Sequence, residues 1–139
     1  MLNIEEQLIQ EEGLRLTAYH DTLGNWTCGV GHLMKSDCGT VSLRQVGEWL
    51  AEDIQIARDE CMKRIECWGA LNEARQYVLI SMMFNLGSNR FMGFKKMLLA
   101  LNNGAYAVAS AEMLDSRWAH QVKSRATKLA GIMKSGVLA

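Results

Sequence analysis

The sequence predicts an α+β fold that is mainly helical, in which a small β-hairpin lobe and a larger helical lobe are joined by a long helix. Three observations lead to this prediction. Residues 14–33 combine an alternating stretch with a glycine-rich one, as β-strands do. The segment after them carries apolar side chains at spacings of three and four over several helical turns. Residues 72–86 are apolar almost all round, as in a helix at the centre of a bundle.

The first helix is expected to end at Glu12. A capping box at Asn3 and Glu6 marks its start, and Gly13 is a helix-terminating residue. The stretch LRLTAY then alternates, LGN forms a turn, and WTCGVGHL is rich in β-forming residues and glycine. These features predict a small hairpin directly after the first helix.

Ser42 and Gln45 form a second capping signature, which begins the long helix. Its buried face is expected to carry nine residues: Val46, Trp49, Leu50, Asp53, Ile54, Ala57, Cys61, Met62 and Ile65. Gly87 ends the central helix, and shorter helices are expected near residues 93–101, 106–114 and 123–134. The segments 102–104 and 116–121 are predicted to separate them.

Composition and charge limit the classes of partner. With 139 residues and no proline, linker or repeat, the chain is expected to form one domain over residues 1–139. Fifteen basic residues balance fifteen acidic ones, so no nucleic-acid partner is indicated. The acidic start of the sequence does not resemble a signal peptide, and no apolar run is long enough to span a bilayer. We therefore expect a monomeric protein in the cytoplasm without stable membrane association.

No metal or other cofactor is predicted. The cysteines lie at uneven spacings without a C-x-x-C pair, and reduced thiols are expected at all four: Cys28, Cys38, Cys61 and Cys67. The histidines are scattered without a metal-ligand spacing: His20, His32 and His120. His32, in a Gly-x-Gly-His stretch, is expected to be a fold residue that is hydrogen-bonded to an acid on the next element. The large aromatic residues are expected to pack in the core: Trp49, Trp68, Trp118 and Phe94.

Two carboxyl groups are candidates for acid–base chemistry. Glu12 lies at the negative end of the first helix and beside Glu11, and both effects disfavour its ionised form. Asp21 starts the hairpin and Thr27 lies on the returning strand, so that together they could hold one water molecule. Taken alone, these positions are also common for surface residues with no catalytic role.

A family resemblance adds to this interpretation. Glu12, Asp21 and Thr27 stand at the intervals Glu, eight residues, Asp, five residues, Thr, which resemble the catalytic pattern of phage lysozymes, glycoside hydrolase family 24. The similarity extends over nearly the whole chain through three stretches: Glu12 to Leu16 with Tyr19, Gly24 and Gly29 to Leu33; Phe84 with Gly87 and Gly93-Phe94; and Ser116 to Trp118 with Gln121 and Arg125-Ala126.

The resemblance implies a lysozyme-like fold with a cleft between two lobes. It implies hydrolysis of the β-1,4 bond between N-acetylmuramic acid and N-acetylglucosamine in bacterial peptidoglycan, which causes lysis. Glu12 would be the proton donor, and Asp21 and Thr27 would position the attacking water. Arg125 would reach towards Glu12 from the helical lobe. Saccharide contacts on opposite walls are implied for two further residues: Leu33 and Phe84.

The chain departs from the family at several points. The stretch between Leu33 and Val41 is short, which predicts that the third strand and the following turn are trimmed. Met97 and Glu112 stand where other members carry small polar cleft residues.

In a phage setting, the resemblance implies that a holin releases the protein to the cell wall. Two alternatives stay open, namely a zinc-dependent amidase and a non-catalytic peptidoglycan-binding module.

Overall fold

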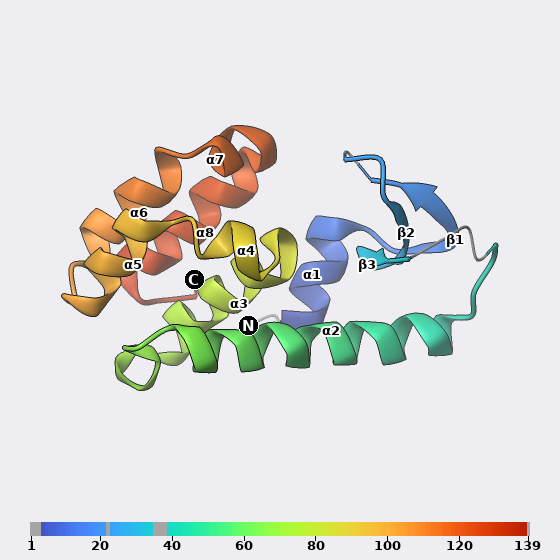
Figure 1. Cartoon of the computed structure of the whole chain (residues 1–139), viewed down its shortest axis with the longest axis horizontal. Helices are drawn as coiled ribbons and strands as arrows, with labels where there is room; N and C mark the ends of the chain where they lie inside the picture. Colours follow the sequence, from blue (N-terminus) through green and yellow to red (C-terminus); the bar gives the residue numbers. More distant parts are fainter. Residues whose placement is uncertain (1–3, 22, 35–38, 139) are drawn as a thin grey trace. The chain divides into compact units, whose positions relative to one another are not determined.

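Helices and one small antiparallel sheet make up the chain, which confirms the predicted α+β class (Figure 1). The structure is a computed structural model, and it describes residues 4–21, 23–34 and 39–138. Two compact units are present, residues 2–56 and residues 57–139, and the boundary between them lies inside the long helix α2 (Leu43–Arg64). Each unit is described in turn.

Helix α1 (Ile4–Glu12) ends where the sequence predicted. Gly13 has a φ of +78°, a conformation that glycine adopts without steric cost, and its N–H donates to the Ile9 carbonyl at 2.9 Å. Leu8 is fully buried and anchors the helix in its unit. Asn3, the first half of the predicted capping box, lies outside the described residues. The functional consequence is that Glu12 occupies the last helical position, next to the sheet.

The sheet has three strands in the order β1 (Arg15–His20), β2 (Trp26–Gly29) and β3 (His32–Leu33). All pairs are antiparallel, and Tyr19 lies opposite Thr27 on β1 and β2. The third strand has only two residues, in agreement with the prediction that it is trimmed. Gly29 and Gly31 both have positive φ, so the chain can reverse within two residues. The turn expected next, at residues 35–38, lies outside the described residues.

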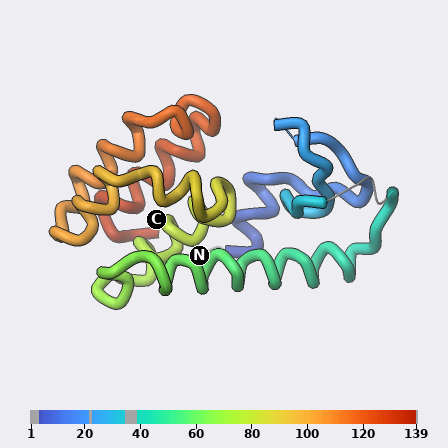
Figure 2. The backbone as a smooth tube through the Cα atoms, in the orientation of Figure 1, coloured from blue at the N-terminus to red at the C-terminus, as the bar shows by residue number. Residues whose placement is uncertain are grey.

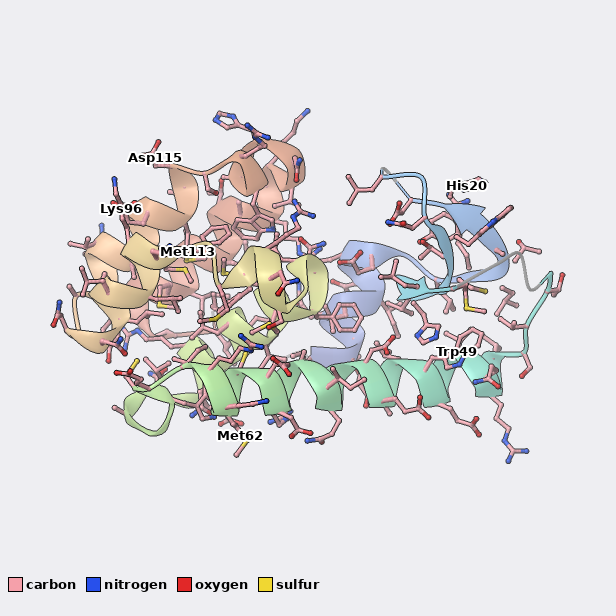
Figure 3. All side chains as sticks on the ribbon, viewed as in Figure 1. His20, Trp49, Met62, Lys96, Met113 and Asp115 are labelled. Atoms are coloured by element: carbon pink, nitrogen blue, oxygen red, sulfur yellow. The ribbon has the colours of Figure 1, made fainter. Side chains whose placement is uncertain are left out.

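The N-terminal signal of α2 is confirmed, since Ser42 Oγ accepts from the Gln45 N–H at 3.1 Å. The predicted face is buried at six positions: Val46, Leu50, Ile54, Ala57, Cys61 and Ile65. Trp49 and Asp53 are half-buried, and the prediction was wrong for Met62, which is 58% exposed and projects away from the helix (Figure 3). It follows Cys61 by one residue and therefore lies about 100° around the helix from the buried stripe.

In its described part the unit of residues 57–139 consists of helices joined by short turns and loops, and Figure 2 shows its backbone path. Its remaining elements are η1 (Trp68–Ala70), α3 (Glu73–Leu86), α4 (Ser88–Phe91), α5 (Lys95–Asn102), α6 (Tyr106–Leu114), α7 (Arg117–Val122) and α8 (Ser124–Ser135). As predicted, α3 is the central helix, with Val78, Leu79 and Met82 fully buried. Helix α8 packs against α3, α6 and α7.

Two short helices were not predicted. Helix α4 follows Gly87 directly, and α7 occupies the segment 116–121 that was expected to separate helices. Ser116 caps α7, because its Oγ accepts from the Ala119 N–H at 3.1 Å. A helix of six residues is too short to show an amphipathic repeat, so the cap was the only local signal.

The packing role predicted for Trp118 is confirmed. Its side chain is buried, its Nε1 donates to Asn85 Oδ1 at 2.8 Å, and its ring meets Phe94 edge-on at 6.2 Å. Cys61 and Cys67 carry free thiols, as expected, and Cys28 is fully buried. Cys38 lies outside the described residues. Within the described ranges, no helix is both long and apolar enough to cross a membrane.

Candidate active site

Glu12 rests against the turn between β2 and β3. A methyl group built on Gly31 would lie 3.4 Å from Glu12 Oε2 and 3.7 Å from its Cδ. Gly31 also has a φ of +68°, which a residue with a side chain adopts only with strain. A side chain at position 31 would thus be in van der Waals contact with the half-buried carboxyl group of Glu12, and glycine leaves that space open.

Asp21 is held by the turn that follows it. Its Oδ1 accepts from the backbone N–H groups of Leu23 at 2.9 Å and Asn25 at 2.8 Å, and its Oδ2 accepts from Asn25 Nδ2 at 3.3 Å. Desolvation acts to raise the pKa of Asp21, but the hydrogen bonds from Asn25 and Leu23 outweigh it and lower the pKa below its usual value. Asp21 is therefore ionised at neutral pH and fixed in orientation.

Thr27 is linked to Asp21 through one residue. The Thr27 side chain is buried, and its Oγ1 donates to the Asn25 carbonyl oxygen at 3.0 Å. Asn25 therefore contacts both partners, since it donates to Asp21 and accepts from Thr27. Sequence reasoning assigned this residue only to a turn. The residue type of Asn25 could have indicated this role, because an asparagine in a turn often forms hydrogen bonds with neighbouring residues.

Tyr19 was also missed as a member of the site. Burial raises the pKa of the Tyr19 phenol, the negative charge of Glu12 raises it further, Arg15 opposes the shift, and Asp21 adds to it. The influence of both carboxylates places the phenol near the two groups. Tyr19 and Asp21 are two residues apart in an extended stretch, and such residues point to the same side of a strand. This spacing could have identified Tyr19.

His32 is the fold residue that the sequence predicted. Its Nδ1 lies 2.6 Å from Oδ2 of Asp53 on α2, and its ring stacks on Trp49 with centroids 4.4 Å apart and planes 6° from parallel. Figure 3 shows Trp49 projecting from α2 on the side of the sheet. The acid predicted on the next element is thus Asp53. In the described part of the chain, no group of three or more His, Cys, Asp and Glu side chains is arranged to hold a metal ion.

Comparison with known proteins shows that residues 9–135 match the phage lysozyme family. The chain belongs to that family. It is similar to probable T4-type lysozyme 1 of Dictyostelium discoideum, with 27% identity over 98% of the chain and 96% of the relative. It is 34% identical to an endolysin of Acyrthosiphon pisum secondary endosymbiont phage 1, over 88% of the chain and 82% of that protein. This phage lysozyme is therefore an enzyme that hydrolyses peptidoglycan.

A third relative contains a similar sequence within a longer protein. The lysozyme is 30% identical to pre-baseplate central spike protein Gp5 of Enterobacteria phage T4, over 99% of the chain but only 28% of that protein. The similarity thus covers one part of Gp5. The family therefore includes both chains of about this length and larger proteins that contain a similar stretch.

The predicted site residues of the lysozyme fall in both units. Glu12, Asp21, Thr27 and Leu33 lie in residues 2–56, and Leu33 is 63% exposed. Phe84 on α3 and Arg125 on α8 lie in residues 57–139. The roles of all six residues stay predictions.

The helical unit of the lysozyme contains a pocket of about 790 Å³. Met97 and Glu112, the two departures from the family pattern, both line it. The pocket has apolar walls from Phe94, Met97 and Trp118, and its charged lining residues carry both signs: Arg90, Lys95, Lys96, Glu112, Asp115 and Arg117. Lys96 and Asp115 are labelled in Figure 3 on the outer side of this unit.

Proposed function

We propose that this phage lysozyme cleaves the β-1,4 bond between N-acetylmuramic acid and N-acetylglucosamine, with Glu12 as the general acid. The observation that carries the proposal is the arrangement within residues 2–56. The carboxyl group of Glu12 faces the open space that Gly31 leaves beside it, while Asn25 links Asp21 to Thr27 in the same small lobe. One acid and one water-binding pair are what glycoside hydrolysis with inversion requires.

The hydrogen bonds suggest how the water is held. Thr27 donates its hydroxyl proton to Asn25, so its oxygen lone pairs remain available to accept from a water molecule. The ionised Asp21 accepts the second water proton and takes it up as the bond forms. The water oxygen then attacks the anomeric carbon, while Glu12 gives its proton to the departing sugar oxygen. One C–O bond forms and one breaks, and the two carboxyl groups exchange protonation states.

The direct test is Glu12→Gln, which removes the proton and preserves the shape. We expect a loss of activity of about 100- to 10,000-fold on purified peptidoglycan with unchanged folding. Glu5→Gln is the matched control, since Glu5 is an exposed carboxylate on the same helix. Equal activity of Glu12→Gln and Glu5→Gln would refute the assignment.

Product analysis distinguishes the other candidate functions. Mass spectrometry of the released material should show saccharides with new reducing ends. Release of stem peptides from intact glycan would instead indicate an amidase, and wall binding without products a binding module. NMR spectra taken at once after mixing should show the α-anomer, because a single displacement inverts the β-bond. An initial β-anomer would contradict the role proposed for Asp21 and Thr27.

We also propose contacts beyond the reacting groups. Leu33 and Phe84 would contact saccharide units, and the charged pocket beside Met97 and Glu112 would receive the flank of the substrate. Arg125 would stabilise the ionised form of Glu12 after proton transfer. In support, the Nε and Nη2 atoms of Arg125 are withdrawn from solvent, where a positive charge acts over a longer range than in water. Arg125→Lys should then lower kcat more than it raises KM.

Finally, we propose that the lysozyme depends on a holin for access to the wall. Helix α1 carries four carboxylates, Glu5, Glu6, Glu11 and Glu12, and inserting them into a bilayer would be costly. Cells that express the chain in the cytoplasm should grow until chloroform breaches the inner membrane and should then lyse. Lysis before chloroform would contradict this proposal.

A further inference from the structure

The turn that faces Glu12 is tied to α2 by three contacts. A methyl group on Gly29 would lie 3.2 Å from Val46 Cγ1, so strand β2 packs closely on the helix. His32 Nδ1 lies 2.6 Å from Asp53 Oδ2, and the His32 ring lies flat on Trp49. All of these residues belong to the unit of residues 2–56. We call the His32, Asp53 and Trp49 side chains the turn anchor.

The turn anchor is partly shielded from water. The side chains of His32 and Asp53 are 22% and 24% exposed, so their hydrogen bond is screened less than one at the surface. By contrast, the Arg44–Glu48 pair on the same helix is 90% and 52% exposed. The turn anchor is therefore a strong local constraint, whereas the Arg44–Glu48 pair contributes little.

His32 follows Gly31 directly in the chain. A methyl group built on Gly31 would lie 3.4, 3.7 and 3.8 Å from the Oε2, Cδ and Cγ atoms of Glu12, so the side of Gly31 that lacks a side chain faces Glu12. Any shift of His32 along α2 must move Gly31 and change the surface against which Glu12 rests. The preceding Val30 is 2% exposed, which limits compensation on that side of the turn.

We propose that the turn anchor positions the general acid, with His32 and Asp53 acting on Glu12 through Gly31. The inference rests on the proposed role of Glu12. A general acid must lie within hydrogen-bonding distance of the oxygen that it protonates. A displacement of about 1 Å can lower a rate by about 100-fold. His32 and Asp53 are thus positioning residues, because the proposal has them act on Glu12 through the position of Gly31.

The test compares Asp53→Ala with Asp53→Asn. Asp53→Ala removes the hydrogen bond to His32, whereas Asp53→Asn retains an oxygen that can accept it. Both are assayed on purified peptidoglycan at a temperature well below the melting temperature of each variant. We expect Asp53→Ala to lower kcat by about 10- to 100-fold at nearly constant KM. Asp53→Asn should recover most of the lost kcat.

A control separates positioning from stability. Ser110→Ala removes a buried hydrogen bond of 2.7 Å to the Ala130 carbonyl in the helical unit. It should lower the melting temperature while kcat stays unchanged. If Asp53→Ala is folded and retains the full kcat, the turn anchor only stabilises the lobe and the proposal is overturned.

Two further variants, Trp49→Leu and Glu12→Gln, test the proposal when Asp53→Ala alone does not. If Asp53→Ala does not fold, Trp49→Leu removes the ring beneath His32 and leaves the hydrogen bond. We expect it to reduce kcat several-fold, and an unchanged kcat would again overturn the proposal. Glu12→Gln distinguishes a failure of the positioning proposal from a failure of the proposed function. If Glu12→Gln is inactive while Asp53→Ala is fully active, only the positioning proposal fails, whereas an active Glu12→Gln refutes the proposed function itself.

Discussion

Arg75 connects the start of α3 to the end of α8, and its replacement is expected to destabilise the helical unit. Its Nε donates to the Met133 carbonyl at 2.7 Å and its Nη2 to the Lys134 carbonyl at 3.1 Å. The guanidinium also lies 3.8 Å from the centroid of the Tyr106 ring. These carbonyls belong to the last turn of α8, where a positive charge interacts favourably with the helix dipole.

The magnitude follows from the contacts. Hydrogen bonds from a charged donor contribute about 1.5–3 kcal/mol each when buried, and less at a half-exposed site. The cation–π contact adds about 0.5–1 kcal/mol. We therefore expect Arg75→Met to lower the free energy of unfolding by about 3 kcal/mol, which corresponds to roughly 10 °C in melting temperature for a chain of this size. Arg75→Lys should lose about half as much, since it keeps the charge but not the planar fork.

Urea titration followed by circular dichroism measures both variants. Arg44→Met is the matched control, because Arg44 is 90% exposed and pairs only with Glu48 on its own helix among the described contacts. It should change the free energy of unfolding by less than about 0.5 kcal/mol. A loss in Arg75→Met no larger than that in Arg44→Met would refute the assignment of Arg75 as the residue that closes α8.

Three other predictions concern stability. Because the folded state lowers the pKa of Asp21, its carboxylate stabilises the fold above the unfolded pKa of about 4, and this contribution is lost as the pH falls through the lower folded value. Asp21→Asn should thus lower the urea midpoint at neutral pH but much less in acid, and an equal loss at both would contradict it. Ser81 is fully buried, and its hydroxyl has no hydrogen-bond partner within the described residues. Ser81→Ala should therefore raise the free energy of unfolding by about 1 kcal/mol. A lower free energy of unfolding measured by calorimetry would contradict this expectation. Lys123 has a φ of +50° before α8. Lys123→Gly should relieve backbone strain of about 1–3 kcal/mol, which exceeds the cost of about 0.5–1 kcal/mol from the greater entropy of the unfolded chain. The melting temperature should therefore rise, and a lower value would refute this expectation.

The features that the sequence alone determined are those with a local physical signal. Gly13 predicted the end of α1 because a left-handed glycine stops a helix within one residue. Ser42 and Gln45 predicted the start of α2 through a bond that spans only three residues. The all-round apolar character of residues 73–86 predicted a central helix, since only a helix surrounded by others can bury every side. The likeness of Glu12, Asp21 and Thr27 to the phage lysozyme pattern predicted the family.

The tertiary structure decided which distant residues meet. The sequence predicted an acid partner for His32, but Glu48, Glu52 and Asp53 all lie on the next helix, and only the path of the chain selects Asp53. The proximity of Gly31 to Glu12 likewise involves residues from different elements. In the sequence, Gly31 is already explained by the tight turn with positive φ, so its position beside Glu12 could not be predicted. Local signals arise from hydrogen bonds that close within a few residues and depend on residue type alone. Contacts across the fold depend on the packing of whole elements, which no short segment of the chain encodes.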